Sequence, residues 1–129
     1  MSSENKPKFT ILRQGDVVVI PLKNEDVFRY FDRLFSVGSV VDNDDLIGAR
    51  SSAYGKVVIR GEFHDHVLNG FYKFVNLGED VYIVKCESNC ILNHPEHGAL
   101  RLDKGLYLVF RIFDWHRRIA RFGLRRGGD

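Results

Sequence analysis

The sequence has few of the residues that cross-link small secreted domains or carry a chain through a membrane. It contains two cysteines, three prolines and one tryptophan in 129 residues, which excludes a framework of several disulfides. No window approaches the roughly 20 apolar residues that a membrane-spanning helix needs. The first eight residues, MSSENKPK, lack the hydrophobic run of a secretory signal. These absences predict an intracellular protein, in the host cytoplasm if it is viral, with no membrane partner.

The signatures of several functional classes are missing as well. The chain shows no Ser-His-Asp order, no phosphate-cradling glycine loop and no dinucleotide-binding fingerprint. The acidic run at residues 42–45, D-N-D-D, lacks the glycine and the terminal glutamate of a calcium-binding EF-hand loop. Nucleophilic, nucleotide-dependent and calcium-binding functions are therefore disfavoured.

The composition is that of a globular domain, with 44% apolar and 28% charged residues. A chain of this length buries roughly two thirds of its unfolded surface in one core. We expect residues 1–129 to form a single domain, with flexible ends at residues 1–8 and 117–129.

Short runs rich in β-branched residues predict strands, most of them after residue 56. The one strong helical pattern covers residues 27–35, where Asn24 is the candidate N-cap and Gly38 follows the end. No alternation of strands and helices is present. The sequence thus predicts a mainly β fold, an antiparallel barrel or sandwich of about eight short strands with one helix packed on it. The expected strands cover residues 9–12, 16–22, 56–62, 63–68, 71–77, 81–86, 90–93, 99–102 and 106–113.

Two hairpins are predicted from turn residues. Asn69-Gly70 is typical of a type I′ turn, since both residues tolerate positive φ, and this turn would set Lys73 opposite His66. A lysine there would favour the neutral imidazole. The second hairpin would turn at residues 103–105.

Four of the five histidines form two close pairs, His64 with His66 and His94 with His97. Residues two apart in a strand project from one face, so we expect the first pair to stand side by side and the second to meet it. Four imidazoles so placed predict a divalent metal site for zinc, iron or manganese, with Glu96 as ligand or general base. The alternative is a metal-free cluster in which the histidines bond one another, Asp65, Glu96 and backbone groups to fix the rim of the barrel.

Cys86 and Cys90 precede His94 and His97 with the spacing C-x3-C-x3-H-x2-H, a second possible zinc set. The two sulfurs could also pair as a disulfide across residues 87–89. Reduced thiols, at least one of them buried, are the third reading and the one we favour.

The positive charge is concentrated at the C-terminus. Six arginines against two aspartates from residue 111 onward give +4, which leaves the rest of the chain at −2 of a net +2. A basic segment of this kind can contact nucleic acid. The candidate contacts in the C-terminal segment are Arg117, Arg118, Arg121, Arg125 and Arg126.

The order of these motifs resembles a group of small β-rich proteins from bacteriophages, archaeal viruses and bacterial genomes. The similarity spans residues 14–113. Phe63 and residues 111–115 depart from the pattern of the group. The matching residues are Gln14-Gly15-Asp16-Val17, Gly61 with His64 and His66, His94 with Glu96, His97 and Gly98, and Gly105 with Tyr107.

The resemblance implies a viral or mobile-element origin rather than a reaction. We expect a small β-barrel binding module, a homodimer, in which the histidine cluster is a metal site. The alternatives are a nucleic-acid-binding protein and a metal-dependent hydrolase or oxygenase of cupin-like type. This sequence lacks the glutamate that usually follows the H-x-H pair in cupins.

Overall fold

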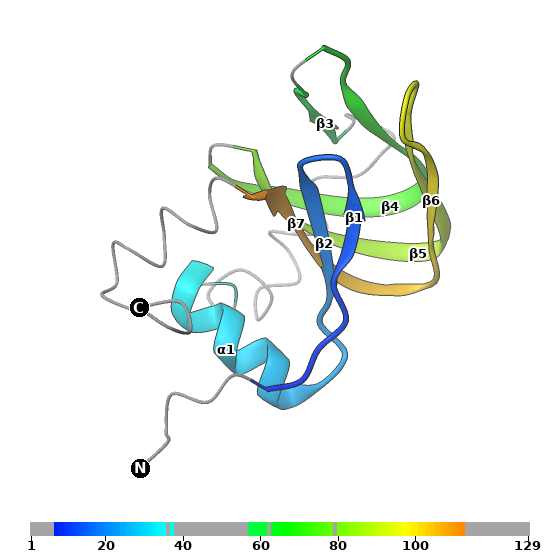
Figure 1. The fold of residues 1–129 in the computed structure, drawn as a ribbon. Helices are drawn as coiled ribbons and strands as arrows, with labels where there is room; N and C mark the ends of the chain where they lie inside the picture. The colour runs from blue at the N-terminus through cyan, green and yellow to red at the C-terminus, as the bar shows by residue number, and fades with distance from the viewer. Residues whose placement is uncertain (1–6, 36, 38–56, 62, 79, 113–129) are drawn as a thin grey trace.

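The computed structural model describes residues 7–35, 37, 57–61, 63–78 and 80–112 (Figure 1). The acidic run at residues 42–45 and the arginine-rich segment at 117–129 lie outside the described residues. The elements follow one another as β1 (Leu12–Gln14), β2 (Val17–Pro21), α1 (Glu25–Phe35), β3 (Val58–Ile59), β4 (His66–Gly78), β5 (Val81–His94), β6 (Gly98–Leu102) and β7 (Gly105–Arg111).

The described strands form one antiparallel sheet of seven strands in the order β1-β2-β7-β5-β4-β3, and β6 pairs with β5 beside this path. The predicted mainly β, antiparallel fold with one helix is confirmed. The described residues form seven strands, where about eight were predicted for the whole chain. Because β1 and β3 stand at the two ends of the path, the described sheet is not a closed barrel. Within the described residues, no helix has the length and apolarity needed to cross a bilayer.

Helix α1 forms where the sequence predicted it, and for the predicted reason. The Asn24 side-chain oxygen accepts hydrogen bonds from the backbone N–H groups of Asp26, at 2.8 Å, and Val27, at 3.4 Å, which caps the first turn. Val27, Phe31, Leu34 and Phe35 are buried. This face covers one side of the sheet, where it packs against residues such as Ile20 and Phe110.

Strands β2 and β7 are buried on both faces, which explains their continuous apolar runs. Val18 and Ile20 point into the cluster under the helix. Val17 and Val19, one residue out of phase, point into a second cluster on the opposite face. The helix therefore covers only one of the two apolar clusters, and the sheet itself must bury the other.

The sheet does this by bending along a line that crosses neighbouring strands. Gly70 pairs with Cys90, and Tyr72 with Cys86, so three residues of β5 lie opposite one residue of β4. On the other side of β5, Cys90 pairs with Leu102 and Cys86 with Gly105. The irregularities of β4 and β5 are thus aligned with the junction between β6 and β7, and β6 rises away from the direction of β7 (Figure 1). Bulges bend and twist strands in this way.

Three sequence predictions were wrong at this bend. The residues at 69–70 and 103–105 are not hairpin turns, because β4 continues through Asn69-Gly70 and both β6 and β7 pair with β5. The two strands expected at 81–86 and 90–93 are one strand, β5, interrupted by a bulge. Turn residues and bulge residues share the same need for irregular backbone, so local sequence does not separate them.

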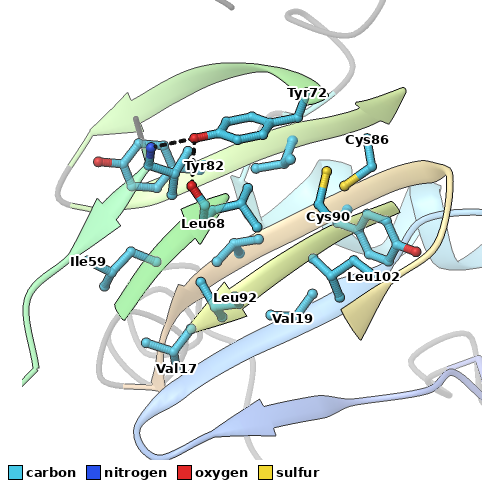
Figure 2. Close-up of a cluster of buried hydrophobic side chains, with 14 residues drawn as sticks. Val17, Val19, Ile59, Leu68, Tyr72, Tyr82, Cys86, Cys90, Leu92 and Leu102 are labelled. Carbon is cyan, nitrogen blue, oxygen red and sulfur yellow. Dashed lines mark hydrogen bonds between the residues drawn. The ribbon is translucent and has the colours of Figure 1, made fainter. Parts of the chain in front are cut away.

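The second apolar cluster lies inside the bend (Figure 2). Leu68 and Leu92 from one half of the sheet meet Val19 and Tyr82 from the other. Tyr72 connects the corner to the start of β3, because its hydroxyl accepts from Val57 N and donates to Leu68 O, both at 3.0 Å.

Cys86 and Cys90 flank the β5 bulge, and their sulfur atoms face one another in this cluster (Figure 2). Both are free and buried in the structure, which confirms the predicted burial; the reduced state stays a prediction. Burial raises the pKa of each thiol above its usual value, so the reactive thiolate is disfavoured.

A substitution at Gly70 tests whether the sheet bends at this bulge. Its φ is +129°, and a Cβ there would lie 2.9 Å from Asn89 O and from Cys90 Cα. We expect Gly70→Ala to lower the free energy of unfolding by about 3 kcal/mol, since backbone strain and overlap with β5 add. Gly98→Ala is the control: its φ is +78° but a Cβ would meet nothing within 4 Å, so we expect a loss of about 1 kcal/mol. Urea denaturation measures both; equal losses would contradict the close approach at the bulge.

Candidate functional site: a histidine pocket

The four paired histidines lie together beside the tip of the β1–β2 hairpin. The ring centroid of His94 is 5.9 Å from that of His64, 4.3 Å from that of His66 and 4.6 Å from that of His97. The expected meeting of the two pairs is therefore confirmed. Their role as metal ligands stays a prediction.

His94 ends β5 and holds the turn that follows. Its Nδ1 accepts hydrogen bonds from the backbone N–H groups of Glu96 and His97, both at 3.1 Å. A nitrogen that accepts carries no proton, so in the neutral ring the proton is on Nε2. His94 therefore presents an N–H at its other edge.

His66 has the opposite arrangement, and Gln14 determines it. The Gln14 side-chain nitrogen donates to Leu92 O at 2.8 Å and to Gly98 O at 2.6 Å. Its oxygen must then be the atom that lies 3.0 Å from His66 Nδ1. An amide oxygen only accepts, so Nδ1 of His66 carries the proton and Nε2 of the neutral ring carries a lone pair.

That lone pair faces a carboxylate. Asp16 Oδ1 lies 3.3 Å from His66 Nε2, and Asp16 Oδ2 lies 3.3 Å from Nε of Arg111 at the end of β7. Burial lowers the pKa of His66, the nearby His94 ring lowers it further, and Asp16 raises it, with a net lowering. Burial thus favours the neutral imidazole, despite the carboxylate.

Two glycines allow these side chains to lie close to one another. Gly15, at φ +63°, forms the hairpin turn with Asp16, and a Cβ there would lie 2.8 Å from Nε2 of His97. Glycine with positive φ at the first central position is typical of a type II′ turn. A Cβ on Gly61 would lie 2.2 Å from His64 O and 3.3 Å from His66 Nε2. The absence of a side chain at residue 61 therefore leaves space on one side of His66 Nε2.

These groups surround a pocket of about 490 Å³. His94, Glu96 and His97 form a group that can hold a metal ion, because one ligand atom from each lies within 4.8 Å of the others. His94 is buried in this group, and the other two are exposed. The pocket is lined by Asp16, Gly61, Phe63, His66, His94, Glu96, His97 and Arg111.

The first histidine pair differs from its prediction. His64 precedes β4 and is exposed, whereas His66 begins β4 and is only 1% exposed, so the two do not stand side by side on a strand. Lys73 does not face His66: it pairs with Lys85 in the sheet and lies 3.4 Å from the Glu87 carboxylate. Burial, rather than a lysine, favours the neutral His66.

Sequence analysis did not identify Gln14, Asp16 or Arg111 as site residues. Asp16 reaches the pocket from the hairpin tip and Arg111 from the end of β7, whereas Gln14 contacts His66 without lining the pocket. The Gln-Gly-Asp run was the available signal, because a polar tripeptide that interrupts two apolar strands places its side chains at one tip.

The competing cysteine set is not assembled. Cys86 and Cys90 belong to the buried cluster inside the bend, whereas His94 and His97 line the pocket. Along the described chain, the group of metal-ligating side chains contains neither cysteine.

The family model described as Domain of unknown function (DUF8820) matches residues 13–112. The chain belongs to this family. The DUF8820 match begins beside Gln14 and ends beside Arg111, so it contains every residue that lines the pocket. No curated protein and no solved structure matches the chain.

The buried His66 makes stability depend on pH in a defined direction. Its pKa in the folded protein is lowered, so as pH falls through about 6.5 the unfolded chain takes up the proton first. We expect the free energy of unfolding to fall between pH 7.5 and 5.5, and to level off below the folded pKa. Urea denaturation at several pH values, with a chelator present, measures this dependence. It should be weaker in His66→Asn, and equal slopes in the two proteins would contradict the assignment.

Proposed function

We propose that this protein is a metal-binding module whose pocket holds a divalent transition-metal ion on His66 Nε2 and Asp16 Oδ1. The supporting observation is the 3.3 Å separation of these atoms. A tetrahedral ion with bonds of about 2.1 Å separates its ligand atoms by about 3.4 Å. A neutral His66 directs a lone pair at the carboxylate oxygen, and two electron-rich atoms at this distance favour a cation between them.

Both proposed ligands have the outer partners that metal ligands typically have. His66 donates its other ring N–H to Gln14, and the second oxygen of Asp16 is held by Arg111. Such partners fix the tautomer of a ligating histidine and the orientation of a ligating carboxylate. This support is independent of the spacing between the ligand atoms.

Glu96 and His97 are the candidates for the remaining ligands in this proposal, although the group whose ligand atoms lie within 4.8 Å of one another joins them to His94 rather than to His66 and Asp16. Both are exposed on the turn after β5, and the His97 ring lies against Gly15, next to Asp16. His94 is left out, because its Nδ1 already accepts two backbone hydrogen bonds and its Nε2 carries the proton. His64 does not line the pocket. Two nitrogen and two oxygen ligands suit zinc, iron or manganese better than calcium or magnesium.

The other sequence predictions remain proposals. Hydrolase or oxygenase chemistry, with Glu96 as general base, requires the metal site first. Nucleic-acid binding depends on arginines at 117–126, outside the described residues. The homodimer and the viral or mobile-element origin remain expectations from the sequence pattern.

One substitution made at two buried histidines tests the ligand assignment. His66→Asn keeps a side-chain N–H for Gln14 but removes Nε2. His94→Asn keeps an acceptor for the turn amides but likewise removes Nε2. We expect His66→Asn to weaken metal affinity more than about 100-fold, and His94→Asn to leave it within a few-fold. Elemental analysis and calorimetric titration with zinc, iron(II) and manganese measure the affinity.

Asp16→Asn should weaken metal binding as His66→Asn does, since it removes the anionic ligand and keeps the shape of the turn. Loss of the metal in His94→Asn with retention in His66→Asn would place the ion on the group of His94, Glu96 and His97. Loss of the metal in His64→Ala would support the four-histidine site predicted from the sequence. Full retention in both His66→Asn and Asp16→Asn would refute the proposal.

A further inference from the structure

We infer that the metal-loaded pocket binds an oxyanion group, a phosphate or a carboxylate, on a molecule that also carries an aromatic ring. This inference rests on the proposed metal site and names its ligand. The polar half of the recognition comes from His94, which lines the pocket. Its Nδ1 is occupied by the turn amides, so its Nε2–H is a donor held in place by the fold.

The balance of charge makes this binding depend on the metal. The lining residues include the carboxylates of Asp16 and Glu96 and the guanidinium of Arg111. With the histidines left aside, these fixed charges leave the pocket at −1, which repels an anion. A divalent ion changes the balance to +1. The metal and Arg111 then attract an oxyanion, and the fixed N–H of His94 orients it.

The aromatic half comes from Phe63. This ring lines the pocket and is 78% exposed, more than any other large hydrophobic side chain in the described residues. In the sequence it lies between Gly61 and His64, and in the structure it shares the pocket lining with His66. A planar ring on the ligand can stack on it and remove both apolar surfaces from water.

Calorimetric titration of the full chain with phenyl phosphate, inorganic phosphate and benzoate tests the inference. Metal content is measured first for each protein. In the metal-loaded parent, we expect phenyl phosphate to bind more tightly than inorganic phosphate. Binding of benzoate shows whether the site also accepts a carboxylate in place of a phosphate. In the presence of a chelator, we expect no binding.

Two variants separate the recognition elements. His94→Asn should keep the metal yet weaken phenyl phosphate roughly tenfold or more, since one charge-assisted hydrogen bond is lost. Phe63→Ala should remove the advantage of phenyl phosphate over inorganic phosphate and leave inorganic phosphate unchanged. Lys85→Gln, which removes an exposed charge outside the pocket, controls for non-specific attraction and should change nothing.

The outcomes distinguish this inference from the proposed function. A protein that takes up metal but binds neither phosphate nor benzoate overturns the oxyanion site and leaves the metal site standing. Equal binding with and without metal also overturns it, as does unchanged anion affinity in metal-loaded His94→Asn. Failure to take up metal overturns both, because the pocket then opposes anions.

Discussion

The side-chain amide of Gln14 bonds three groups that belong to three strands. It donates to Leu92 O on β5 and Gly98 O on β6, and it accepts from His66 on β4. The hairpin that carries it is β1–β2, at the far end of the strand order. One amide thus connects parts of the sheet that no backbone pairing joins. Without it, the two carbonyls and the imidazole N–H would lose a partner, at about 1–3 kcal/mol for each buried group.

That connection is possible only because the sheet bends. The aligned irregularities at Gly70, at residues 87–89 and at residues 103–104 turn the first half of β4, the second half of β5 and all of β6 over the rest of the sheet. The start of β4 and the end of β5 then reach the β1–β2 tip. The same bend buries the second apolar cluster. Core formation and pocket assembly therefore depend on one feature of the backbone, which the tight contact at Gly70 supports.

Sequence patterns predicted the parts of this molecule that local chemistry controls. The helix followed from apolar spacing and its Asn24 cap, and the meeting of the two histidine pairs followed from their placement around β strands. The bend could not be predicted, because Asn69-Gly70 satisfies the requirements of a turn as well as those of a bulge. Neither could Asp16 and Arg111 be assigned to the pocket, nor Gln14 to its contact with His66. Their positions depend on which strands pair, and distant pairing leaves no local pattern.

The two buried histidines share one ring chemistry and have opposite proton positions. His94 accepts at Nδ1 from its own turn, and His66 donates at Nδ1 to Gln14. The metal-free alternative predicted from sequence therefore fits the Nδ1 edge of each ring, where the hydrogen bonds hold the fold together. The other edges differ: a lone pair on His66 faces Asp16, and an N–H on His94 faces away from its turn. A pocket with a basic nitrogen and a fixed donor on adjacent rings can distinguish a cation from an anion, which a cluster of equivalent histidines cannot.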